Sequence, residues 1–294
     1  MATAEARGGP GPPLHPRESF RELPRPLQHP EALCWDPLTE RIYCGGEGGQ
    51  LYAVTLDGAI AEVANTGGSI LGMAVDGAGI VYACDWHKDE VLRIDPSTGA
   101  WSTYTAGAPD LHIDDPNSPV FADDGTMYVT GSENPAIFRV APGGATEVWS
   151  RAAPGYPNGV TLTPAGDALV VAESHPEDHD GGRIWLIPIE PDGRAGEASI
   201  LAELWHTVPD GVAYDVDGNL YVAHYTPDRI DRIAPDGTVT VLVEDWEAVY
   251  LNAPTNIAFA GPDLSLVVAA CVGEEFLAVA DLGIRGVPLR RPVL

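Results

Sequence analysis

A unit of four short β-type runs repeats along most of this chain. It is clearest at residues 209–245, where GVAYD, NLYVAH, RIDRIA and TVTVLV are separated by the turn signals DVDG and PDG. Alternating apolar and polar residues between Asp/Gly-rich turns predict an antiparallel meander. Related segments begin at residues 30, 70, 116, 157 and 254, which makes six copies roughly 40 to 50 residues apart. Six four-stranded units of this length predict an all-β chain folded as a six-bladed β-propeller.

The ends of the repeat predict how the ring closes. The last copy lacks an evident fourth strand, because the chain ends in GVPLRRPVL. Residues 19–23 precede the first copy and could supply that strand, which would cover an exposed sheet edge. Residues 1–17 are rich in Gly, Pro and Ala without periodicity and are expected to form a flexible tail. We therefore expect residues 18–294 to form one propeller domain, closed by its N- and C-terminal segments.

The charge balance excludes several classes of partner. The chain has 43 acidic and 16 basic residues, for a net charge of −27. Such a surface repels phosphate backbones and anionic lipids and attracts cations, so neither nucleic acid nor a membrane is an expected partner. The N-terminus MATAEARGGPGPP has no apolar signal-peptide core, and no apolar run is long enough to cross a bilayer. We expect a cytoplasmic protein, and the acidic surface predicts no particular oligomeric state.

One position of the repeat gathers candidate metal ligands. It lies just before the first strand of each copy, and its occupants are Glu31, Leu71, Asn117, Asn158, Asp210 and Thr255. Five of the six follow a proline, which stiffens the entry to the strand. Because the first strands of propeller blades line the central channel, these side chains should converge at one mouth of it. Two carboxylates and two amides suit one hard divalent cation, most simply Ca²⁺. Each could instead be an ordinary turn residue, but four at one repeat position are hard to explain in that way.

At these residues the sequence resembles the SMP-30/gluconolactonase/LRE-like family of six-bladed propellers. The resemblance spans residues 30 to about 288 and is carried by HPEALCWDP, PNGVTLTPAGDALVVAES, VPDGVAYDVDGNLYVAH and APTNIAFAGPDL. It implies that Glu31, Asn158 and Asp210 bind a catalytic divalent metal and that Asp210 is also the acid/base. Asn117 matches an asparagine that binds substrate or completes the metal shell. Sugar lactonases of the family commonly carry Arg-x-Asn-Asp there, whereas this chain has Asp-Pro-Asn-Ser from Asp115 onward, which leaves aldonolactone specificity open.

The mouth of the channel should also carry substrate-binding groups. Loops between second and third strands, and links between blades, lie on the same face as the ring position; these segments include Trp86 and residues 173–179. The candidate substrate-binding residues are Asn117, Leu71, Thr255, Asn256, His206 and His224. His175 and His179 have a spacing that could bind zinc, although a solvated loop is the simpler interpretation.

The ring of oxygen ligands and the family resemblance together predict a metal-dependent hydrolase that opens a lactone. The resemblance implies a gluconolactonase-like enzyme with one divalent ion, for which Zn²⁺, Mn²⁺ or Mg²⁺ are alternatives to Ca²⁺. The ion would polarise the carbonyl, and Asp210 would activate water or protonate the leaving alkoxide. Two alternatives stay open: a metal-dependent phosphotriesterase or arylesterase of the same fold, and a non-catalytic calcium-binding scaffold. The related strictosidine-synthase-like branch uses a glutamate instead of a metal, and the four-ligand ring argues against it.

Overall fold

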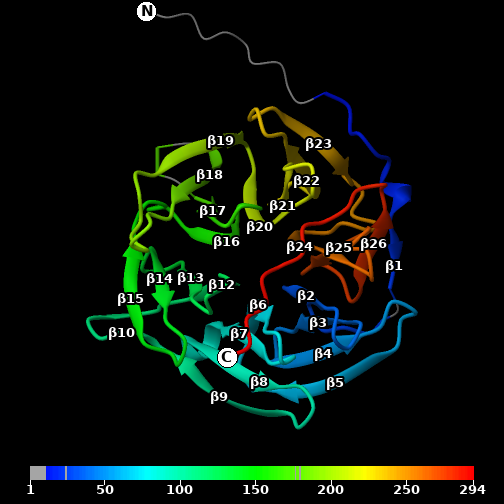
Figure 1. Ribbon diagram of the computed structural model, residues 1–294. Helices are drawn as coiled ribbons and strands as arrows, with labels where there is room; N and C mark the ends of the chain where they lie inside the picture. Colours follow the sequence, from blue (N-terminus) through cyan, green and yellow to red (C-terminus); the bar gives the residue numbers. More distant parts are fainter. Residues whose placement is uncertain (1–10, 24, 176, 179) are drawn as a thin grey trace, which may run out of the picture.

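The computed structural model describes residues 11–23, 25–175, 177–178 and 180–294. In these residues six four-stranded antiparallel sheets surround a central axis (Figure 1). The sheets follow the six sequence copies in order, and we number them blade 1 to blade 6. The predicted all-β, six-bladed propeller is therefore confirmed.

Each blade is a meander in which consecutive strands pair. Blade 1 contains β2 (Leu33–Asp36), β3 (Arg41–Gly45), β4 (Gln50–Val54) and β5 (Ile60–Asn65). Blade 2 contains β6 (Ile70–Val75), β7 (Val81–Asp85), β8 (Glu90–Asp95) and β9 (Ala100–Thr105). Blade 3 contains β12 (Pro116–Phe121), β13 (Met127–Gly131), β14 (Ala136–Val140) and β15 (Thr146–Ser150). Blade 4 contains β16 (Pro157–Leu162), β17 (Ala168–Glu173), β18 (Gly181–Pro188) and β19 (Ser199–Trp205).

The last two blades complete the ring. Blade 5 contains β20 (Val208–Tyr214), β21 (Leu220–Thr226), β22 (Arg229–Ile233) and β23 (Val239–Glu244). Blade 6 contains β24 (Pro254–Ala260), β25 (Leu266–Cys271), β26 (Leu277–Asp281) and, from the other end of the chain, β1 (Arg21–Glu22). A short hairpin of β10 (Gly107–Ala108) and β11 (Leu111–His112) lies in the link between blades 2 and 3.

The N-terminal segment closes the ring. Strand β1 pairs antiparallel with β26, with Arg21 opposite Val279 and Glu22 opposite Ala278. It therefore covers the outer edge of blade 6, as the sequence predicted.

The chain before β1 runs along blade 5. The backbone N–H groups of Leu14 and His15 donate to the carbonyls of Val241 and Leu242, at 3.0 and 2.9 Å. The segment that the sequence assigned to a flexible tail is thus attached to β23 from Leu14 onward. Residues 1–10 of that segment lie outside the described residues.

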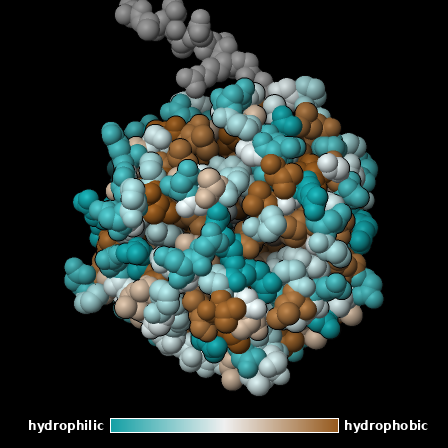
Figure 2. All heavy atoms as spheres, viewed as in Figure 1, coloured by the Kyte–Doolittle hydropathy of each residue, from teal (hydrophilic) through white to brown (hydrophobic). Residues whose placement is uncertain are grey.

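The C-terminal tail crosses one end of the channel (Figure 1). Gly286 forms a β-bridge with Asp215, and the N–H of Gly77 donates to the carbonyl of Pro292 at 2.8 Å. Residues 287–291 and the first strands of all six blades enclose a mainly apolar cavity of about 280 Å³. Figure 2 views this face, where hydrophilic residues lie over the middle of the ring.

The hydrophobic core lies between adjacent blades. Between blades 4 and 5, for example, Val170 and Ile184 pack with Val222 and Ile233. Each such side chain contributes about 1.5–3 kcal/mol when it is fully buried. Outer strands such as β9 are largely exposed. Packing between the blades therefore holds the first strands around the channel.

The two helices of the described residues are three-residue 3-10 turns, η1 (Arg17–Ser19) and η2 (Trp86–Lys88). In the part of the chain that the structure describes, no helix has the length and apolar character needed to span a membrane.

Candidate active site

The structure brings the four predicted metal ligands to one cavity. Glu31, Asn117, Asn158 and Asp210 line a cavity of about 440 Å³ at the end of the channel where the first strands begin. The two asparagines and Asp210 are buried, with 5 to 8% of each residue exposed, and Glu31 is partly exposed. The cavity enclosed by the C-terminal tail lies further along the same strands.

Bulges and glycines in the first strands position these side chains. The pairing register shifts between Pro157 and Val160 in blade 4, and a β-bulge of this kind redirects the side chains beside it. Asn158 is followed by Gly159, where a Cβ would lie 2.2 Å from the backbone oxygen of Asp210. Only glycine permits this approach of two neighbouring first strands, which brings Asn158 and Asp210 onto adjacent positions of the ring.

Hydroxyl groups of neighbouring blades hold the backbone of the ring. Each donates a hydrogen bond of 2.7 Å to a carbonyl at or beside a ring position: Thr130 to Asn158, Ser132 to Pro157, Ser174 to Pro209, and Thr255 to Glu31. These bonds fix the backbone of the ring residues and leave their side chains to face the cavity.

The amide of Asn158 has a fixed orientation. Its Nδ2 donates to the hydroxyl oxygen of Ser174 at 3.1 Å, and that hydroxyl donates its own proton to the carbonyl of Pro209. Ser174 can therefore only accept from the amide, which turns Oδ1 of Asn158 away from it. Oδ1 is buried and has no hydrogen-bond partner. An unpaired buried acceptor beside carboxylates fits a cation ligand, because a cation satisfies it without a proton.

The two carboxylates of the ring disfavour each other's charge. Burial, and then the negative charge of Glu31, raise the pKa of Asp210 well above its usual value. Burial raises the pKa of Glu31 to about 7, and the charges of Asp115 and Glu47 add to this effect. A divalent cation between the two carboxylates would remove this conflict.

The ligand set is poor in charged donors for a metal site. No group of three or more His, Cys, Asp or Glu side chains that could hold a metal occurs among the described residues. An ion at this ring would therefore depend on the amide oxygens of Asn117 and Asn158 as well as on the two carboxylates. Oxygen-only ligands of this kind suit Ca²⁺ better than Zn²⁺.

Comparison with known proteins identifies the family. The model of the SMP-30/Gluconolactonase/LRE-like region matches residues 110–271, which is more than half of the chain. The chain belongs to this family. The resemblance found in the sequence is thus confirmed.

Relatives of this SMP-30-like chain include enzymes and a calcium-binding protein. The 6-deoxy-6-sulfogluconolactonase of Pseudomonas putida is 32% identical over 84 residues, a match that spans only 28% of this chain and 28% of that enzyme. A gluconolactonase from Xanthomonas campestris has a TM-score of 0.76 at 16% identity, over 92% of this chain and 89% of its own. Regucalcin from Agrobacterium tumefaciens, described as calcium-binding, has a TM-score of 0.74 at 18% identity, over 92% of this chain and 94% of its own.

The same fold also hosts other chemistry. Virginiamycin B lyase from Staphylococcus aureus has a TM-score of 0.65 at 15% identity, over 90% of this chain and 99% of its own. At such identities the likeness of the solved structures shows the fold, and the chemistry must be argued from the site.

Two further predicted residues lie at the ring. Leu71 lines the cavity with the four polar ring residues. Thr255 is buried, and its hydroxyl supports the carbonyl of Glu31 from behind.

The other predicted substrate-binding residues lie elsewhere. Asn256 lines the apolar cavity under the C-terminal tail. His206 is exposed, with its Nδ1 3.0 Å from Oδ2 of Asp180. His224 is fully buried, and its Nε2 lies 3.0 Å from Oδ2 of Asp231. Neither histidine is among the described residues that line the site cavity.

The loops predicted to surround the mouth do reach it. Trp86 and His175 line the cavity, and each directly or closely follows the second strand of its blade. The zinc interpretation also needs His179, which lies outside the described residues.

Several residues of the cavity wall were not predicted from the sequence, although their positions follow two simple rules. Residues two positions before a ring residue line the cavity in four blades: His29, Ser69, Tyr156 and Val208. Residues close to the end of the second strand line it as well: Glu47, Tyr225 and Val272 were missed, beside the predicted Trp86, Ser174 and His175. Strand alternation predicts the first set and loop position the second, so both could have been read from the repeat.

Proposed function

We propose that this chain is a metal-dependent, gluconolactonase-like hydrolase that opens a lactone ring. The observation that carries the proposal is the buried, unpaired Oδ1 of Asn158 in the same cavity as the carboxylates of Glu31 and Asp210. The names of the relatives support it, since two are lactonases and one is a calcium-binding protein.

Glu31, Asn117, Asn158 and Asp210 would hold one divalent ion, with Ca²⁺ the best match to their oxygen ligands. When bound, such an ion polarises a substrate carbonyl as a Lewis acid. The two carboxylates balance its charge, and the hydrogen bond from Nδ2 of Asn158 to Ser174 fixes the amide and leaves its buried Oδ1 unpaired for such an ion.

Asp210 is the proton carrier of the proposed reaction. Its carboxylate accepts a proton from water while the water oxygen bonds to the carbonyl carbon of the lactone. The ring C–O bond then breaks, and Asp210 returns the proton to the departing ring oxygen, which becomes the alcohol of a hydroxy acid. Positioned proton transfer of this kind is worth about 10²–10⁴-fold in rate.

Proton release from a lactone panel tests the proposal. The metal-stripped protein should be inactive, and addition of Ca²⁺, Zn²⁺ or Mn²⁺ should restore turnover above the spontaneous rate. Asp210→Asn should lower kcat/KM by at least about 100-fold without loss of the folded state in circular dichroism. Glu62→Gln makes the matching carboxylate-to-amide change on the exposed outer strand β5 and should keep full activity.

Three outcomes would contradict the proposal. Full activity of Asp210→Asn would remove the acid/base role from this residue. Hydrolysis of aryl esters or phosphotriesters, but of no lactone, would reassign the substrate. Tight metal binding without any turnover would favour a calcium-binding scaffold.

A further inference from the structure

The mouth of the site cavity presents an apolar, aromatic wall. Trp86 and Tyr225 line the cavity although they are 45% and 50% exposed. Leu71, Val208 and Val272 line it beside them. Large aromatic side chains are usually buried, and those left exposed around a cavity are typical of surfaces that a ligand covers.

The charged groups of the same cavity are acidic. Glu31, Glu47 and Asp210 line it, and none of the lining residues that the structure describes is lysine or arginine. The nearby Lys88 is turned to the outside of blade 2, where its Nζ lies 5.2 Å from the centre of the Trp101 ring. If a divalent ion balances Glu31 and Asp210, the carboxylate of Glu47 remains at the mouth, with its Oε2 3.8 Å from Nδ1 of His29, a nitrogen that also lies 3.0 Å from the carbonyl oxygen of Val272.

A further carboxylate, that of Asp115, contacts a residue that lines the cavity. The hydroxyl of Tyr156, which lines the cavity, donates to Oδ2 of Asp115 at 2.5 Å. Asp115 is only 4% exposed, and its Oδ1 is buried without a hydrogen-bond partner. Because the Tyr156 hydroxyl donates its proton to Asp115, its oxygen can only accept a hydrogen bond from a ligand.

We infer that this site selects lactones with an uncharged aryl or alkyl substituent and rejects lactones that carry a sulfonate, phosphate or carboxylate. The inference rests on the proposed lactonase function. The substituent would lie on Trp86 and Tyr225 while the lactone carbonyl faces the ring of oxygen ligands. An anionic group in the same place would meet the carboxylate of Glu47, and no lysine or arginine among the described lining residues would balance the two charges. The Pseudomonas putida relative is named for a sulfonated lactone, so the two proteins should differ in this preference.

Three matched substrates measure the preference on the metal-loaded protein. They are δ-valerolactone, its phenyl-substituted form, and the same phenyl lactone with a para-carboxylate. The kcat/KM of the phenyl lactone should exceed that of each of the other two by about tenfold.

Variants of the wall assign the preference to residues. Trp86→Ala and Tyr225→Ala should each reduce the ratio of kcat/KM for phenyl over unsubstituted lactone by about fivefold. Trp246→Ala removes a tryptophan that is 79% exposed and is not among the described lining residues, so it should leave this ratio unchanged. Glu47→Lys should raise kcat/KM for the carboxylate relative to the phenyl lactone by about fivefold.

The failure of this inference is distinguishable from that of the lactonase proposal. Hydrolysis of the carboxylate lactone as fast as the phenyl lactone would overturn the inference and leave a lactonase. If no lactone is hydrolysed with any ion, the lactonase proposal fails, and calorimetric titration of the same lactones measures their binding. Tighter binding of the phenyl lactone than of its carboxylate would then support the selectivity of the cavity, and equal binding would overturn it.

Discussion

At the scale of single residues, the amide of Asn158 depends on the hydroxyl of Ser174. We predict that Ser174→Ala weakens Ca²⁺ binding by about 10- to 100-fold, because Nδ2 loses its acceptor and the amide can turn its oxygen away from the site. Calorimetric titration of the metal-stripped protein measures the change. Ser132→Ala is the matched control, since its hydroxyl supports a ring carbonyl but no described amide of the site. Equal losses in the two variants would contradict the role assigned to Ser174.

The ring residues were predictable for a reason that the wall residues lacked. Glu31, Asn158 and Asp210 recur at the repeat period, so superposition of the copies isolates them. The residue type at the wall positions changes from copy to copy, as between Ser69, Tyr156 and Val208, so superposition of the copies does not mark these positions as a site. His206 and His224 were selected by chain position, which does not show that one side chain faces solvent and the other packs inside blade 5.

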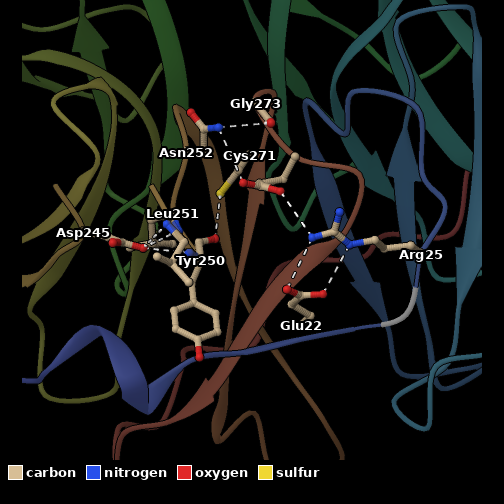
Figure 3. A network of polar contacts seen from close by, with 10 residues as sticks. Glu22, Arg25, Asp245, Tyr250, Leu251, Asn252, Cys271 and Gly273 are labelled. Atoms are coloured by element: carbon tan, nitrogen blue, oxygen red, sulfur yellow. Dashed lines mark hydrogen bonds and ion pairs between the residues drawn. The ribbon is translucent and has the colours of Figure 1, made fainter. Parts of the chain in front are cut away.

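At the scale of elements, the link after β23 is folded around one carboxylate. Oδ2 of Asp245 accepts hydrogen bonds from the N–H groups of Val249, Tyr250 and Leu251, at 2.9, 2.7 and 3.1 Å (Figure 3). Arg17 donates to Oδ1 at 3.1 Å, which ties the N-terminal segment to this link. Burial alone would raise the pKa of Asp245, but these hydrogen bonds outweigh it and hold the pKa below its usual value.

We predict that Asp245→Asn lowers the free energy of unfolding by about 2 kcal/mol at neutral pH. A carboxyl whose pKa is lower in the folded state stabilises the fold above its unfolded pKa of about 4, and this contribution is lost as the pH falls through the folded value. The difference from the parent protein should therefore shrink in acid. Urea unfolding at neutral pH and below about pH 4 measures it. Asp110→Asn, an exposed control, should show no difference at either pH, and a pH-independent loss in Asp245→Asn would contradict the argument.

The repeat predicts strands better than the links between blades. The β-type runs of each copy predicted the blades, although the last copy lacks a fourth run, since alternation and turn residues recur in all six. The hairpin of β10 and β11 has no counterpart among the other links of the described residues, and superposed copies cannot reveal a feature of one copy. The packing of the link around Asp245 likewise depends on Arg17, which lies 228 residues away in sequence.

At the scale of the whole molecule, the described N- and C-terminal segments each contact more than one blade, but the sequence predicted only one of these contacts. An unpaired edge in the last copy and a spare β-type segment before the first copy predicted the pairing of β1 with β26. The C-terminal tail instead spans several blades. Arg291 Nη2 donates to the carbonyl of Asp76 in blade 2 at 2.9 Å, and Arg290 Nε donates to Asp123 in blade 3 at 3.1 Å. The partners of the C-terminal tail lie in turns of different copies, so the repeat pattern does not predict them.

Removal of residues 1–23 should lower the melting temperature by about 10 °C. The deletion removes β1 and the buried side chains of Phe20 and Leu23, which together contribute about 5 kcal/mol. It also uncovers the N–H and carbonyl groups of β26, so the shortened protein should associate through this edge as its concentration rises. Calorimetry and sedimentation measure the two effects. Phe20→Ala with Leu23→Ala, which keeps β1, should lower the melting temperature without promoting association, because the edge remains paired. A deletion variant that melts like the full chain would contradict closure of the ring by β1.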